Sequence, residues 1–107
     1  MSTNARRVGI EEVESEFGVL SFGRLLKSHR LGEGFSQVEM AKCMRLSKQS
    51  LNDLENERKI PSIRRAVEIG KKLGVLEELV VQLVLQDHLR REKLNYKVKI
   101  SKIQKAS

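Results

Sequence analysis

The strongest constraint on the fold comes from residues 36–62, which specify two short helices joined by a tight turn. Ser36 is followed three residues later by Glu39, a capping-box spacing in which the hydroxyl and the carboxylate each satisfy a free backbone N–H at a helix start. Ser47 is a good N-cap for a second helix, which we predict over residues 48–56. The two helices are close enough in sequence that we expect them to pack as one unit.

Each of these helices has an apolar face and a polar face. Met40, Ala41 and Met44 share the inward face of the first helix, and Leu51 and Leu54 share that of the second. A polar helix face is more often a solvated surface than a binding site. The second helix nevertheless points Lys48, Gln49 and Asn52 outward, and these are side chains that hydrogen-bond to base edges and phosphates. Asp53 is also expected to point outward.

Three more helices flank the central pair. The apolar periodicity predicts them over residues 21–31, 63–73 and 76–94, and glycines just beyond the first two are expected to end those helices. The sequence therefore predicts an all-α fold of five helices. At 107 residues the chain is one domain with appendages.

The C-terminal part carries two signals for association with a second chain. The apolar stripe of the last helix is wider than packing on one small domain needs, which indicates a partner helix. Beyond it, apolar residues alternate with lysines, a period of two that is typical of a strand, and a lone strand needs a partner. A second copy of the chain is the simplest partner, and we predict a homodimer that uses Leu79, Leu83, Tyr96, Val98 and Ile100.

The chain divides into three predicted parts. Residues 1–18 are expected to form a flexible or partly helical N-terminal arm, with a short acidic helix over residues 10–17. Residues 19–75 hold the first four helices. Residues 76–107 hold the last helix, the short strand and a basic tail, and are the predicted dimerisation segment.

The charge of the chain permits contact with phosphates. The net charge is +7, and the positive charge is concentrated in residues 19–74 and 86–107. A basic protein gains affinity for nucleic acid through released counterions, although a basic balance alone is weak evidence for binding. A single cysteine, Cys43, excludes an internal disulfide and fits a reducing cytosol.

Several other classes of function are disfavoured. The chain has no apolar run long enough to cross a membrane, so no membrane association is predicted. It has no cluster of metal ligands and no nucleophile with an activating neighbour in sequence. We therefore predict that the chain is not an enzyme and needs no cofactor and no metal.

The two-helix pattern resembles the helix-turn-helix of the Cro and phage-repressor family, often called XRE-type. The resemblance covers residues 20–74, about half of the chain. The residues that carry it are Arg30, Ser36-Gln37, Met40-Ala41, Ser47, Leu51, Leu54-Glu55 and Pro61-Ser62. The family implies a five-helix, repressor-like DNA-binding domain over residues 19–75 whose third helix lies in the major groove.

The resemblance also implies roles for individual residues. Gln37 would hydrogen-bond a phosphate or an outer base, and Arg30 with Glu55 matches a structural pair that ties the first helix to the third. Base contacts would come from Lys48, Gln49 and Asn52, and backbone contacts from Asn56, Arg58 and Lys59. Ser47, Ser50 and Asp53 complete the predicted DNA-contacting set, although a carboxylate such as Asp53 either accepts from cytosine or repels phosphate.

Two positions depart from the family pattern. The family usually has glycine in the turn between the two helices and often after the third helix, where this chain has Arg45 and Glu57. A positive φ at Arg45 would cost about 1 kcal/mol or more. The acid at Glu57 would lie close to the expected phosphates.

The leading hypothesis is a cytoplasmic, nucleoid-associated regulator of transcription, of the repressor type, that binds double-stranded DNA as a dimer on a two-fold symmetric operator. The alternative is a protein-interaction module. An antitoxin-type or adaptor chain would use residues 86–107 to bind a protein partner, either a toxin or RNA polymerase.

Overall fold

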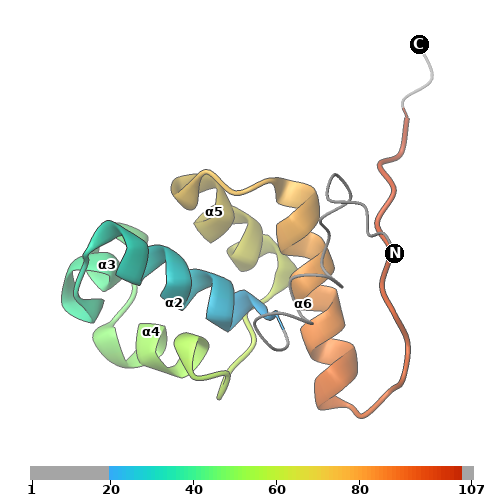
Figure 1. The fold of residues 1–107 in the computed structure, drawn as a ribbon, viewed down its shortest axis with the longest axis horizontal. Coiled ribbons are helices and arrows are strands. Elements are labelled where there is room, and N and C mark those ends of the chain that lie inside the picture. The colour runs from blue at the N-terminus through green and yellow to red at the C-terminus, as the bar shows by residue number, and fades with distance from the viewer. Residues whose placement is uncertain (1–19, 105–107) are drawn as a thin grey trace, which may run out of the picture.

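The computed structural model describes residues 20–104, and these residues form five α-helices (Figure 1). The helices are α2 (Phe22–Glu33), α3 (Gln37–Met44), α4 (Lys48–Glu55), α5 (Ile63–Leu73) and α6 (Glu77–Arg91). The predicted all-α fold is thus confirmed. The predicted N-terminal arm, including its short acidic helix, lies outside the described residues.

Serine side chains start the first four of these helices. Ser21, Ser36, Ser47 and Ser62 each accept a hydrogen bond from the backbone N–H three residues on. At Ser36 the predicted capping box is complete, because its own N–H also donates to Glu39 Oε1 over 2.8 Å. These caps fix where α3 and α4 begin and therefore which side chains lie in their first turns.

The helix ends differ from the predicted ones in two places. Helix α2 runs to Glu33 because Gly34, not Gly32, adopts the left-handed conformation that ends it, with φ of 75°. Helix α6 ends at Arg91, three residues earlier than predicted. Leu76, predicted to belong to the apolar stripe of that helix, is its N-cap and is 74% exposed.

The turn between α3 and α4 is made without glycine. Arg45 has a φ of 57° and a ψ of 44°, and its N–H bonds to carbonyls at the end of α3. The left-handed conformation expected at this position is therefore present, on a residue whose Cβ makes it unfavourable.

Replacing Arg45 by glycine is expected to stabilise the domain by about 0.5–1 kcal/mol, because relief of the left-handed strain exceeds the extra chain entropy that glycine loses on folding. Urea unfolding followed by circular dichroism measures this change. Arg45→Ala is the matched control, since it removes the same guanidinium but keeps the Cβ. An equal gain in both variants would contradict a backbone origin.

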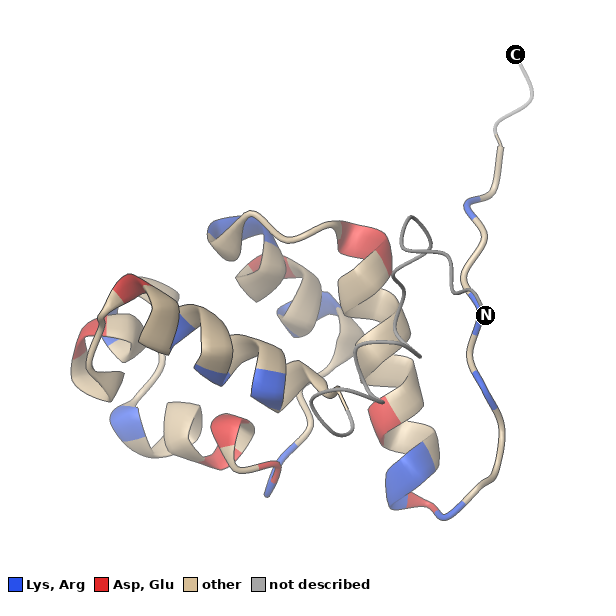
Figure 2. Cartoon of the chain, viewed as in Figure 1, with Lys and Arg blue, Asp and Glu red and all other residues tan. Residues whose placement is uncertain are grey.

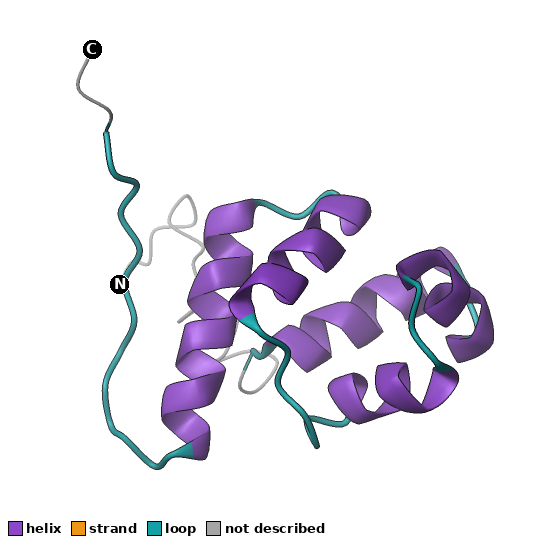
Figure 3. Cartoon of the chain, turned by 180° about the vertical axis from the view of Figure 1, so that it is seen from behind, coloured by secondary structure: helices purple, strands orange, loops and turns teal. Residues whose placement is uncertain are grey.

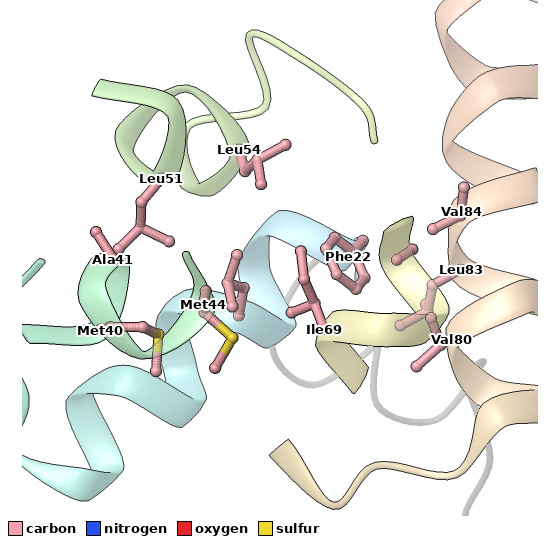
Figure 4. Close-up of a cluster of buried hydrophobic side chains, with 12 residues drawn as sticks. Phe22, Met40, Ala41, Met44, Leu51, Leu54, Ile69, Val80, Leu83 and Val84 are labelled. Atoms are coloured by element: carbon pink, nitrogen blue, oxygen red, sulfur yellow. The ribbon is translucent and has the colours of Figure 1, made fainter. Parts of the chain in front are cut away.

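One apolar core joins all five helices. Figure 4 shows Met40, Ala41 and Leu51 on one side of this core and the α6 residues on the other, with Phe22 and Ile69 between them. The α6 residues in the core are Val80, Leu83 and Val84. Helix α6 packs on both α5 and α2 and so belongs to the same packed body as the first four helices.

The core assignment corrects one predicted dimer residue. Leu83 is 1% exposed and is packed inside its own chain, so it has no surface to offer a second copy. Leu79 is half-buried and packs against the same core. The apolar stripe of α6 is wide largely because this helix completes the core of its own domain.

Residues 94–104 form an extended C-terminal arm that runs alongside α6 (Figures 1 and 3). The strand predicted over Tyr96, Val98 and Ile100 is absent, because no neighbouring strand lies within residues 20–104. Instead Gln86 donates to Tyr96 O over 2.8 Å and accepts from Val98 N over 2.9 Å. Gln82 donates to Val98 O over 3.2 Å, so glutamine side chains hold the edge of the arm that faces α6.

Candidate nucleic-acid interface

The polar face of α4 presents the residues predicted to read bases. Lys48 and Gln49 are exposed in its first turn, and Asn52 is half-buried one turn further on. At the helix start, Ser47 Oγ accepts from Ser50 N and donates to Ser50 Oγ, both over 3.0 Å. The two serines therefore bond mainly to each other, while Lys48 and Gln49 extend from the same turn.

Gln37, the first residue of α3, connects the two helices. Its Nε2 donates to Glu55 Oε1 over 3.1 Å, and its Oε1 accepts from Asn52 Nδ2 over 3.3 Å. Both ends of this amide are used inside the protein. The structure thus brings Gln37 and Asn52 together and fixes the orientation of one against the other.

Arg30 and Glu55 form a buried, two-point ion pair between α2 and α4. Arg30 Nε lies 2.7 Å from Glu55 Oε2, and Arg30 Nη2 lies 2.9 Å from Glu55 Oε1. Their side chains are only 10% and 1% exposed. The hydrogen bond with Glu55 raises the pKa of Arg30 above its ordinary value, and the remaining Nη1 donates to Phe35 O over 3.0 Å.

Asp53 lies on the inner side of α4, and its predicted outward orientation is wrong. The residue is 8% exposed. Its Oδ1 accepts from Gln49 Nε2 and from Arg58 Nε, each over 2.9 Å, while Lys59 Nζ is 3.8 Å from Oδ2. The hydrogen bond from Arg58 is the main cause of a lowered pKa at Asp53, so the carboxylate stays ionised at neutral pH. The two cations that follow α4 lie over the acid and cover it.

The loop after α4 brings the predicted phosphate-contacting residues to the same surface. Asn56 Nδ2 donates to Asn52 O over 2.9 Å, and Arg58 also donates to Asn52 Oδ1. Glu57 has a φ of 61°, which turns the chain sharply after the helix. Asn56, Glu57, Arg58 and Lys59 are all exposed, so the loop presents amide and cationic groups beside the α4 face.

An arginine at the end of α6, which the sequence patterns did not indicate, also contacts this loop. Arg91, at the end of α6, donates through Nη2 to Glu57 O over 3.0 Å and to Arg58 O over 3.1 Å. No local pattern in the sequence indicates this contact, because the two partners lie more than thirty residues apart. Arg91 thereby fixes the path of the loop relative to the core.

A buried acid on α6 was also missed, although the sequence carries a signal for it. Asp87 falls on the same helical stripe as Val80 and Val84, and it is 8% exposed. Its Oδ2 accepts from Phe22 N over 3.0 Å at the start of α2. Burial raises the pKa of Asp87, and the hydrogen bond from Phe22 only partly offsets that rise. A carboxylate on an otherwise apolar stripe indicates a buried partner of this kind.

Positive charge extends beyond α4 and its loop. Figure 2 shows Lys and Arg on several helices, intermixed with acids. The charged residues of the C-terminal arm, residues 94–104, are all lysines: Lys97, Lys99 and Lys102. Within residues 20–104 no three His, Cys, Asp or Glu side chains gather in a way that could hold a metal ion. Among the helices of the same residues, none has the length and apolar character that crossing a membrane requires.

Comparison with known proteins agrees with this geometry. A helix-turn-helix family model matches residues 26–79, which is half of the chain and spans α3 and α4. The chain is 38% identical over 66 residues to the ImmF control region 10 kDa protein of Bacillus phage phi105, covering 58% of this chain and 73% of that protein. It is 39% identical over 49 residues to the uncharacterized HTH-type transcriptional regulator YqaF of Bacillus subtilis (strain 168), covering 46% of this chain and 64% of that protein.

The two capped helices, the polar face of α4 and the matched residues define a class of DNA-binding proteins. The chain belongs to the helix-turn-helix family, in the XRE-type branch that its sequence pattern resembles. It is thus a DNA-binding protein of transcription regulation. No solved structure matches the chain significantly.

Proposed function

We propose that the chain is a sequence-specific transcriptional repressor that reads DNA through α4 and binds a two-fold symmetric operator as a dimer. The observation that carries the proposal is the exposed Lys48 and Gln49 pair, presented in the first turn of α4 beside a loop that offers Arg58 and Lys59. The phage relative is named for a control region and the Bacillus subtilis relative for transcriptional regulation, which supports a regulatory role. Such a role would place the chain on the nucleoid in the cytoplasm.

The proposed contacts divide into two kinds. Lys48 and Gln49 read bases in the major groove. Asn52, one turn further along α4, is oriented by its hydrogen bond to Gln37 and contributes a further base contact. Phosphate contacts come from Asn56, Arg58 and Lys59, with Ser47 and Ser50 at the positive end of α4. Arg58 and Lys59 must give up part of their pairing with Asp53 when they bind phosphate.

The proposed dimer uses the C-terminal arm. Tyr96 is 69% exposed although it is aromatic, and Leu94 and Ile103 of the same arm are also exposed. The far edge of an extended segment can pair with the same segment of a second copy. Two copies would place two α4 helices on successive turns of one face of the duplex, about one helical turn apart.

Selection of binding sites from random duplex DNA tests both parts of the proposal. The wild-type chain is expected to select two related half-sites about one helical turn apart. Lys48→Ala with Gln49→Ala removes two base contacts worth about 1–3 kcal/mol each, so the preference for the selected site over random DNA should fall by roughly thirtyfold or more.

The control is Lys71→Ala, which removes an exposed lysine from α5, away from α4 and from the arm. If the control loses as much preference as the α4 variant, α4 is not the reading helix. Single, unpaired half-sites would contradict the dimer and leave the reading of DNA intact.

The alternative function, binding of a toxin or RNA polymerase through residues 86–107, has a specific obstacle. Three hydrogen bonds hold the arm against α6: Gln82 and Gln86 each donate one to the arm, and Gln86 accepts one from Val98 N. A protein partner that bound the arm through this edge would have to displace those bonds. We favour the DNA-reading function because the polar face of α4 and the cations of the loop after it support it independently of the arm.

A further inference from the structure

The side-chain amide of Gln49 has a defined orientation, because its hydrogen-bond partner can only accept. Gln49 Nε2 lies 2.9 Å from Asp53 Oδ1. An ionised carboxylate has no proton to donate, so the group that faces it must be the NH2 of the amide and not the oxygen. This contact removes the usual ambiguity between amide oxygen and nitrogen.

Asp53 is itself held in place from several directions. Arg58 Nε donates to the same Oδ1 over 2.9 Å, and Lys59 Nζ lies 3.8 Å from Oδ2. The backbone carbonyl of Asp53 also accepts from Arg58 N over 2.9 Å and from Lys59 N over 3.3 Å. The loop therefore returns both cations onto this acid through its backbone path, and the carboxylate is a fixed, charged acceptor behind Gln49.

The consequence for Gln49 is that its Oε1 and its second N–H are left for a ligand. In the major groove, adenine offers an N6 donor next to the N7 acceptor, and this pair matches an amide that presents an oxygen with one N–H. Guanine offers only the acceptors O6 and N7 on the same edge, so it would leave the Gln49 oxygen without a donor.

We propose that Asp53 is a specificity-determining residue that does not touch DNA: it fixes the Gln49 amide so that this side chain accepts from adenine and rejects guanine. Asp53 is thus a positioning residue that acts through Gln49. The proposal rests on the proposed reading of DNA by α4 and deepens it by naming the base.

The test compares binding-site selections for five forms of the full chain, one of them a charge control. The site position read by Gln49 is identified as the one whose preference is lost in Gln49→Ala. At that position the wild-type chain should select adenine over guanine. Asp53→Ala frees the amide to turn, and the ratio of adenine to guanine should fall by roughly fivefold or more, since a bidentate pair discriminates by about 1–3 kcal/mol. Asp53→Asn keeps an oxygen acceptor and should restore much of the preference.

Glu78→Ala is the charge control, because it removes one ion-paired carboxylate in the first turn of α6, at the end of that helix away from the loop after α4. An unchanged ratio in Asp53→Ala, guanine at the Gln49 position in the wild type, or a Gln49→Ala variant that selects the wild-type site would each overturn the inference. The first two outcomes leave the proposed function standing, and the third would contradict its assignment of a base contact to Gln49 while leaving DNA reading through the rest of α4 in place. A wild-type chain that selects no sequence would instead contradict the proposed function itself.

A measurement on the unmodified protein covers the case in which Asp53→Ala does not fold. The side-chain amide protons of Gln49, observed by NMR without DNA, should exchange with solvent more slowly than those of the exposed Gln104. Equal exchange rates would show that Asp53 does not hold the amide and would refute the inference.

Discussion

Replacing Arg30 by methionine is expected to destabilise the domain by about 3–5 kcal/mol, because it leaves the carboxylate of Glu55 buried without its cation. Gln37 would remain as a neutral donor to Glu55, which does not compensate for the lost charge. A small domain is stable by only about 5–15 kcal/mol, so this one substitution removes a large part of the total. Urea unfolding followed by circular dichroism measures the loss.

The double variant Arg30→Met with Glu55→Met distinguishes the net stability that the ion pair contributes from the cost of leaving one charge buried alone. A buried pair stabilises little compared with well-packed apolar residues, whereas a single buried charge is costly. We therefore expect the double variant to be clearly more stable than Arg30→Met alone, although it carries one more substitution. A loss in the double variant equal to the sum of the two single losses would show that the charges act independently.

Replacing Gly23 by alanine is expected to destabilise the domain by about 3 kcal/mol, at or above the upper end for overpacked cores. A Cβ at Gly23 would lie 2.2 Å from Leu54 O and 3.3 Å from Glu55 O. These are backbone atoms in the last turn of α4, so the whole end of that helix would have to move. The same shift would displace the loop that follows α4, and affinity for DNA should fall together with the melting temperature.

Gly32→Ala is the matched control on the same helix. Nothing lies within 4 Å of a Cβ at Gly32, so alanine should stabilise α2 there by about 0.5–1 kcal/mol through its better helix propensity. Thermal and urea unfolding of the two variants should therefore change in opposite directions. Similar effects at both positions would mean that α2 and α4 do not approach as closely as described.

Local patterns were sufficient to predict the helices and their starts. The serine caps at residues 36, 47 and 62 act between neighbours in the chain, and all three are formed as expected. The left-handed turn at Arg45 was expected from the family resemblance, because the family usually has glycine at this position. Both Gly32 and Gly34 were expected at the end of α2, and local sequence does not choose between them; Gly34 is the one that ends the helix, so α2 runs to Glu33 and not to Leu31.

The orientation of Asp53 could not be predicted from the same patterns. On a helical wheel it belongs to the polar face, but the loop brings Arg58 and Lys59 back over it. The prediction that Leu83 contacts a second copy was wrong for a related reason. The width of an apolar stripe does not tell whether the same chain or a second chain covers it. The strand predicted in the arm is absent, and the bonds of the arm to glutamine side chains have no period that marks them in the sequence.

The hydrogen bond from Phe22 N–H to Asp87 joins two residues that are 65 positions apart in the chain. During synthesis, the backbone N–H of Phe22 therefore cannot form this hydrogen bond until nearly all of α6 has left the ribosome. The same delay applies to the core residues Val80, Leu83 and Val84, which close the apolar interior. We expect α3 and α4 to be made early but to become a rigid reading surface only after α6 has been synthesised and has packed into the shared core.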